Sequence, residues 1–175
     1  MIRSIGGKSP KIHPTAFVSE AAYLVGNIEV GAYANIWPGV VVRCEGGRAV
    51  IGKNVCVQDN TVIHAAGNIF IGDNVAFGHG VVCHAERIEN DVLVGNGAVI
   101  NGWVHVGEFT LVAAGAVVPE RAQIPAYSIL MGVPAQIKGQ VADKHLEMMR
   151  GVWEPYVKLG QRYKAEGNLE SHDDA

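Results

Sequence analysis

The sequence has 175 residues, 49% of them hydrophobic and 18% charged, which is enough to bury the core of one domain. The net charge of −3 comes without any run of Lys or Arg, which argues against nucleic acid as a partner. No signal peptide or membrane-spanning stretch can be recognised, so we expect a soluble, cytoplasmic protein that does not bind membranes. The three cysteines, Cys44, Cys56 and Cys83, match no zinc-finger or redox spacing and are expected to be reduced.

A six-residue repeat organises the chain from Ile12 to Leu130. Large apolar residues recur at every sixth position, and Gly often follows them, as in "VGAYAN" and "IGDNVA". A period of six does not match the 3.6 residues of an α-helical turn, whereas hexapeptide repeats are typical of a parallel β-helix. The spacing changes at three points, where we expect loops: between Val42 and Ile51, between Ile63 and Ile71, and between Cys83 and Ile88.

The hexads end before residue 139, which divides the chain into a β-helix domain, 1–139, and a helical tail, 140–175, whose last residues we expect to be mobile. The tail predicts a helix over 141–150, a break at Gly151 and a second helix over 155–164, with Pro155 in its first turn. The face of this second helix that is expected to pack on the β-helix holds Tyr156, Leu159 and Tyr163.

Two histidines fall in one column of the predicted β-helix. His64 directly follows the core residue Ile63, and His84 directly follows Cys83. Three hexads separate the two positions, so we expect the histidines to lie on the same face in successive coils. Neighbouring strands are about 4.8 Å apart, close enough for two imidazoles to share one metal ion. Arg43 falls in the same column, below His64.

A third histidine, His79, falls in a different column together with Asp59. On a rigid prism, His79 does not easily reach the histidine pair of its own chain. A neighbouring copy could supply it if prisms packed side by side about a threefold axis, which predicts a homotrimer with three interfacial metal sites. The remaining histidines are expected to be ordinary surface residues: His13, His105, His145 and His172.

The sequence resembles the γ-class carbonic anhydrases and their γ-carbonic-anhydrase-like relatives. The resemblance is carried by "NIWPGVVVR", "VQDNTVIH", "GHGVVCH", "VGNGAVI" and "GVPAQI", the last of which is shared by the wider hexapeptide-repeat superfamily. It implies a left-handed β-helix and a homotrimer that binds zinc through His64 and His84 of one protomer and His79 of the next. It also implies reversible hydration of CO2 to bicarbonate by metal-bound hydroxide. Imidazole ligands also suit Fe²⁺ and Co²⁺.

The resemblance implies roles for five further residues. Gln58 corresponds to the residue that positions the metal-bound water, and Tyr156 to a tail tyrosine that approaches the site. Arg43 and Asp59 resemble the family's pair at the protomer contact. Glu45 stands where the family has Asp in an Arg-x-Asp motif, so a longer carboxylate replaces the usual one.

The segment after His64, "AAGNIF", is short and contains no acidic residue. Well-known active members of the family have a longer acidic loop at this point, with a glutamate that carries protons. The sequence therefore does not decide whether this protein hydrates CO2. Two other functions are also compatible with the sequence. One is a non-catalytic metal-binding scaffold or assembly trimer. The other is a hexapeptide acyltransferase that uses acyl-CoA, although such enzymes usually insert a long loop into the β-helix.

Overall fold

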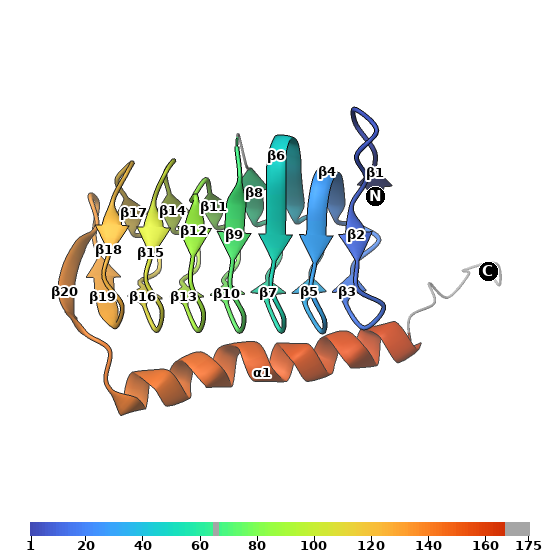
Figure 1. The fold of residues 1–175 in the computed structure, drawn as a ribbon. Coiled ribbons are helices and arrows are strands. Elements are labelled where there is room, and N and C mark those ends of the chain that lie inside the picture. Colours follow the sequence, from blue (N-terminus) through green and yellow to red (C-terminus); the bar gives the residue numbers. More distant parts are fainter. Residues whose placement is uncertain (65–66, 167–175) are drawn as a thin grey trace, which may run out of the picture.

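The computed structural model describes residues 1–64 and 67–166, and its short strands follow one another at the spacing of the repeat (Figure 1). Leu93 pairs in parallel with Leu111, and Val99 pairs in parallel with Val117, so three hexads make one coil. Many corners turn through a residue with positive φ, such as Asn54 (58°). Asn and Gly tolerate this conformation better than other residues. The structure confirms the predicted β-helix with a C-terminal helix.

The stacked coils form a prism with three faces. Two longer strands, β4 (Tyr23–Val30) and β6 (Val41–Ile51), turn the corner between the first and second faces and belong to both. The first face also holds β1 (Ile2–Arg3), β8 (Val62–His64), β11 (Val82–Cys83), β14 (Val99–Ile100) and β17 (Val117–Val118). The second face also holds β2 (Lys11–Ile12), β9 (Ile69–Ile71), β12 (Arg87–Ile88), β15 (His105–Val106) and β18 (Gln123–Ile124).

The third face is a separate sheet of eight strands, and its last strand, β20, runs antiparallel to β19. Its members are β3 (Phe17–Val18), β5 (Asn35–Ile36), β7 (Cys56–Val57), β10 (Ala76–Phe77), β13 (Leu93–Val94), β16 (Leu111–Val112), β19 (Ser128–Met131) and β20 (Gln136–Gln140).

Most coils fill the prism interior with one large apolar residue from each face. Ile36, Ile63 and Phe77 have no exposed surface, and each occupies a position of the six-residue repeat. The continuous apolar column is the main source of stability, because each coil buries its apolar side against the next one.

The predicted loop between Val42 and Ile51 is wrong, because these residues belong to the single strand β6. β6 pairs with β8 before the corner and with β9 after it. Its extra residues form an arch that stands out from the prism (Figure 1). This arch stays hydrogen-bonded because β4 makes a similar turn beside it, and Arg48 pairs with Glu29 of β4 at 2.7 Å. The second predicted loop includes residues 65 and 66, which lie outside the described residues.

The tail forms one helix, α1 (Asp143–Glu166), so the predicted break at Gly151 is wrong. Gly in a helix costs only about 1 kcal/mol relative to Ala, and packing on the prism can offset that cost. Pro155 lies inside the helix rather than in a first turn. A proline ring clashes with the backbone carbonyl of the residue four positions earlier, which here is Gly151, and the backbone of a glycine adjusts more freely than that of other residues. The expectation of mobility concerns residues 167–175, which lie outside the described residues.

α1 runs back along the third face, from the end with β19 to the end with β3 (Figure 1). Its buried side includes Met149 and Gly160, while Trp153 and Tyr156 pack against Trp37 and its neighbours. Leu159, predicted on this side, is 37% exposed. Within the described ranges, 1–64 and 67–166, no helix is long and apolar enough to cross a membrane.

Candidate metal centre

His64 and His84 lie side by side on the first face. The residues before them, Ile63 and Cys83, are paired in neighbouring strands, and the two imidazole centroids are 5.2 Å apart. Partial burial lowers the pKa of His84, and the nearby His64 lowers it further. Both effects favour the neutral imidazole, which is the form that binds a metal ion.

Arg43 and Glu45 lie beside the histidine pair. Arg43 is paired with His64 across the strands and makes a 2.8 Å ion pair with Glu45 of the same chain. The Arg43 guanidinium lowers the pKa of the Glu45 carboxyl. Glu45 Oε2 is 3.6 Å from His64 Nε2, which is too long for a hydrogen bond. In the single chain, the partner of Arg43 is therefore Glu45.

His79 lies at the other edge of the first face. It precedes β11, whereas His84 follows β11, so the strand separates the two histidines. His79 Nδ1 is 3.1 Å from Asp59 Oδ2. A carboxylate in this position holds the proton on Nδ1 and leaves Nε2 free to bind a metal ion. Among residues 1–64 and 67–166 of one chain, no three His, Cys, Asp or Glu side chains gather closely enough to bind a metal ion.

Gln58 and Tyr156 lie on the same side of the prism as His79. Gln58 is 5% exposed and lies near the Cys56 thiol, and burial raises the pKa of that thiol. Tyr156 of α1 rests edge-on against Trp37, with ring centroids 5.4 Å apart. Burial raises the pKa of Tyr156, and nearby Cys56 and Asp59 raise it further. Gln58, Asp59, His79 and Tyr156 thus form one group, which is separate from the His64 and His84 pair.

An uncovered apolar column lies between these two groups. It consists of one outward-facing residue from each strand of the first face except β1, and each member is paired with the member in the next coil. The central member, Val82, is 37% exposed. The outward residues of the second face include charged and polar ones, such as Lys11, Arg87 and Gln123. The members of the column are Tyr23, Val41, Val62, Val82, Val99 and Val117.

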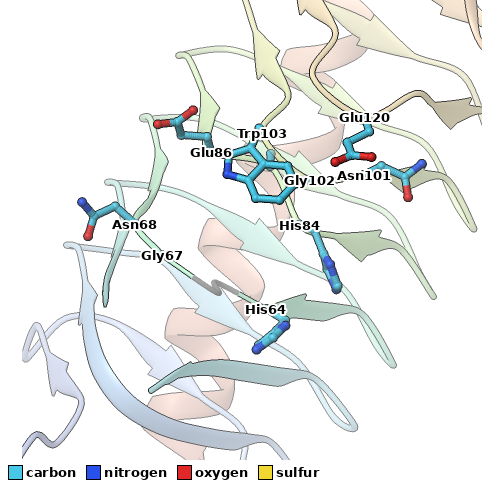
Figure 2. A pocket seen from close by; sticks show the side chains of 10 residues that line it. His64, Gly67, Asn68, His84, Glu86, Asn101, Gly102, Trp103 and Glu120 are labelled. Atoms are coloured by element: carbon cyan, nitrogen blue, oxygen red, sulfur yellow. The ribbon is translucent and has the colours of Figure 1, made fainter. Parts of the chain in front are cut away.

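A pocket of about 650 Å³ adjoins the histidine pair (Figure 2). The repeat does not predict this pocket and could have predicted only one of its residues, Asn101, which follows the core residue Ile100 just as His84 follows Cys83. The pocket is lined by His64, Gly67, Asn68, His84, Ala85, Glu86, Asn101, Gly102, Trp103 and Glu120.

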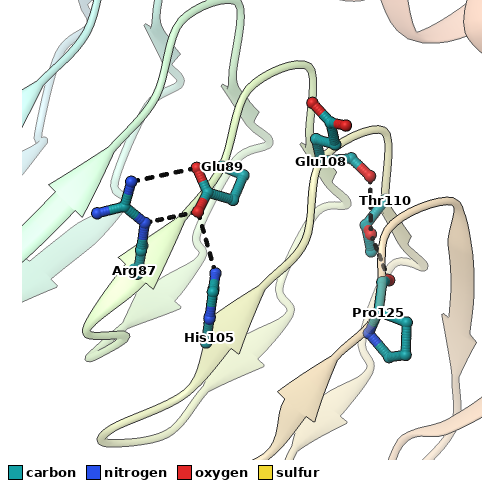
Figure 3. A network of polar contacts seen from close by, with 6 residues as sticks. All are labelled: Arg87, Glu89, His105, Glu108, Thr110 and Pro125. Atoms are coloured by element: carbon teal, nitrogen blue, oxygen red, sulfur yellow. Dashed lines mark hydrogen bonds and ion pairs between the residues drawn. The ribbon is translucent and has the colours of Figure 1, made fainter.

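The other described histidines have local partners. His105 Nε2 is 3.1 Å from a Glu89 oxygen that also accepts a 2.6 Å hydrogen bond from Arg87 (Figure 3). His145 Nδ1 accepts the backbone N–H of Ala142 at the start of α1, and His13 Nδ1 lies 2.9 Å from the Thr15 hydroxyl. These contacts fit the expectation of ordinary surface residues, while His172 lies outside the described residues.

No family model matches the chain. A carbonic anhydrase from Geobacillus kaustophilus is 32% identical over 167 residues, which cover 94% of this chain and 92% of that protein. A mitochondrial γ carbonic anhydrase 2 from Arabidopsis thaliana is 30% identical over 95% of this chain, but the matched part spans only 63% of the plant protein.

Among solved structures, a Bacillus cereus protein described as a candidate acetyltransferase has a TM-score of 0.86 and 28% identity, covering 94% of this chain and 97% of that one. A hexapeptide transferase family protein from Anaplasma phagocytophilum has a TM-score of 0.88 and 26% identity, covering 93% and 97%. The long match with the Geobacillus protein agrees with the repeat and with the motifs around the histidines. The chain therefore belongs to the γ carbonic anhydrase family of hexapeptide-repeat proteins.

Proposed function

We propose that the protein is a metal-dependent carbonic anhydrase that interconverts CO2 and bicarbonate at three sites between the protomers of a homotrimer. His64 and His84 of one protomer and His79 of the next would bind the metal ion. The observation that carries the proposal is the arrangement of the first face. The histidine pair lies along one edge and His79 along the other, with an uncovered apolar column between them.

The apolar column supports assembly through the first face. The third face is covered by α1, and the second face carries charged and polar side chains, whereas on the first face Val82 is 37% exposed and its neighbours in the column are half-buried. Apolar residues on a protein surface favour association when they form one contiguous patch. A heterologous contact repeated about a threefold axis brings one edge of a face to the opposite edge of the next copy.

The residues present fit a metal ion with nitrogen ligands. Two imidazoles lie side by side, and the third has its Nδ1 held by Asp59. Three histidines suit zinc and leave one coordination position open, and iron or cobalt would also fit. Zinc held by these three histidines would supply a bound water whose pKa is about 7, low enough to ionise at neutral pH.

The protein's own residues would orient these groups. Asp59 fixes the His79 tautomer, and Arg43 keeps the Glu45 carboxyl ionised beside His64. The buried Gln58 amide would position the water or CO2, and Tyr156 would close the site from the side of α1. The short segment after His64 provides no acidic residue, so we propose that protons pass directly to buffer. The buried, unpaired cysteines fit the cytoplasmic location that we propose.

Complementation between two inactive variants tests the shared site. His79→Ala and His84→Ala each remove one ligand, and the two chains would be co-expressed with different tags and isolated as mixed trimers. If each site draws on two protomers, every mixed trimer regains one intact site of three. In the isolated mixed trimers, roughly a third of the wild-type number of sites should therefore return. Zinc content and stopped-flow CO2 hydration would be measured on the same samples.

The outcomes separate the parts of the proposal. Zinc bound by neither variant alone but recovered in mixed trimers supports the shared site, and a hydration rate that follows the recovered zinc supports the reaction. If mixing recovers no zinc, the interfacial site is wrong. If the zinc-loaded wild-type protein shows no hydration above buffer, the reaction is wrong, and a metal-binding scaffold remains.

The second candidate function is acyl transfer, which the structural similarity to the Bacillus cereus protein favours. An acyltransferase should bind coenzyme A without metal. The pocket beside the histidine pair carries Glu86 and Glu120, which would repel the phosphates of coenzyme A. Calorimetric titration of metal-free protein with coenzyme A distinguishes the two functions, because the carbonic anhydrase proposal predicts no binding.

A further inference from the structure

The pocket beside His64 and His84 is much larger than CO2 requires. In the single chain its volume of about 650 Å³ lies within the range of sites for small organic ligands, whereas CO2 has three heavy atoms. His64 and His84 line the same pocket as Trp103 and Glu120 (Figure 2). A ligand that fills the pocket would therefore lie next to the position proposed for the metal ion.

Trp103 occupies an unfavourable backbone position in this pocket. Its φ is 56°, in the left-handed region where Asn or Gly occupies several other corners of the prism. A bulky residue in this region is uncommon in proteins, but Tyr33, Phe109 and Tyr127 share this conformation here, so the backbone alone does not distinguish Trp103. Burial does not explain why a Trp occupies this position, because Trp103 is 55% exposed. Its indole already attracts a cation, since the Arg121 guanidinium carbon lies 4.7 Å from the ring centroid.

The charged groups that line the pocket are acidic. Glu86 and Glu120 contribute carboxylates, and none of the described lining residues is a Lys or Arg. Arg121 pairs with Glu120 at 3.5 Å and lies over Trp103, but the side chains of the ion pair are mostly exposed and the pair is weak, so a ligand cation can displace the guanidinium. An aromatic face next to carboxylates is the chemistry that recognises ammonium and quaternary ammonium groups.

We propose that this pocket binds a small organic cation, with its ammonium group against Trp103 and Glu120 and its other end towards His64 and His84. This deepens the proposed function, because it names an organic cation as the class of molecule presented to the metal site. The contacts that hold the cation come from Trp103 and Glu120 and need no metal ion. Binding of the cation and hydration of CO2 can therefore succeed or fail separately.

The test is calorimetric titration of the assembled protein, metal-stripped and zinc-loaded, with choline. Its neutral isostere, 3,3-dimethyl-1-butanol, has the same shape without the charge. We expect choline to bind both forms of the protein, and the isostere to bind roughly tenfold more weakly. Trp103→Asn should weaken choline binding by a similar factor, because Asn removes the indole. Trp103→Phe should retain part of the binding, and Glu120→Gln should weaken it.

Matched controls come from another corner of the prism. Tyr33→Asn also removes an aromatic residue with positive φ (59°), and Glu108→Gln removes an exposed carboxylate, but neither residue lines the pocket. Both variants should bind choline like the wild type. Trp103→Asn should unfold at the same or a higher temperature, because Asn accepts the left-handed conformation readily.

Three results would overturn the proposal: equal binding of choline and its isostere, unchanged binding in Trp103→Asn, or a loss of trimer mass in that variant by light scattering. The last result would make Trp103 an assembly contact. Choline binding without any CO2 hydration would instead overturn the carbonic anhydrase function alone and leave the cation site in place.

Discussion

Two glycines of α1 give opposite predictions for the same substitution. Gly151→Ala and Gly160→Ala both replace the least favourable helix residue other than proline by the most favourable one, a gain of about 1 kcal/mol. At Gly151, which is exposed, an added Cβ meets no atom within 4 Å. At the buried Gly160, it lies 3.0 Å from the Asn35 Cβ and 3.3 Å from the Phe17 Cβ. Only the second substitution forces α1 away from the third face.

The neighbours of Gly160 cannot move freely. Asn35 is 1% exposed, and its Oδ1 accepts a 2.8 Å hydrogen bond from the Trp37 indole. Overpacking a well-filled contact costs about 1–3 kcal/mol, which exceeds the gain in helix propensity. We expect Gly151→Ala to raise the free energy of unfolding by about 1 kcal/mol and Gly160→Ala to lower it by about 1 kcal/mol.

Urea unfolding followed by circular dichroism would measure both variants at one fixed protein concentration, since assembly makes stability depend on concentration. Equal stability of the two variants would refute the reasoning, because it would show that α1 and the third face separate without cost. Tyr156 lies on the same helix, so hydration by Gly160→Ala should also fall if Tyr156 closes the site.

Three further predictions concern the metal, the assembly and pH. Zinc at a hundred times its dissociation constant should raise the free energy of unfolding by about 2.7 kcal/mol, and thermal shift should find this gain lost in His64→Ala. Val82→Asp should yield monomers by light scattering, while Gln123→Asp on the second face stays trimeric; a trimeric Val82→Asp would exclude assembly through the first face. Burial raises the pKa of Asp91 above its ordinary 3.8, so folding favours its protonated form and stability is lost as pH rises through this range. Asp91→Asn should therefore gain stability relative to the wild type as pH rises above the ordinary Asp pKa of 3.8 in urea titrations, and a constant difference would contradict this.

The fold could be predicted from the sequence because its core positions repeat every six residues. Ile36, Ile63 and Phe77 occupy these positions and are fully buried. The repeat could not predict what happens between Val42 and Ile51, because the arch of β6 depends on pairing with β4 and β9. It also could not predict one continuous helix across Gly151, because packing on the third face offsets the low helix propensity of that residue.

The candidate site was predicted in part. The repeat placed His64 and His84 in neighbouring coils, because each directly follows a core residue. The apolar column could also have been predicted from the repeat, because Val62 and Val82 directly precede core residues and therefore face outward on the same face. The pocket could not be predicted from the sequence. It depends on how Trp103 and Glu120, from different coils, come together at one corner.

The path of α1 makes the two ends of the prism depend on each other. The helix starts beside the last coil, and its final turns bind the first one. The Gln161 amide donates to the Thr15 carbonyl at 2.8 Å, and the Lys164 ammonium donates to the carbonyls of Pro14 and Ala16. In a solenoid whose coils contact only their neighbours, the ends can unravel independently. Here, loss of the first coil also removes contacts of α1, so the helix acts as a strap that makes unfolding more cooperative.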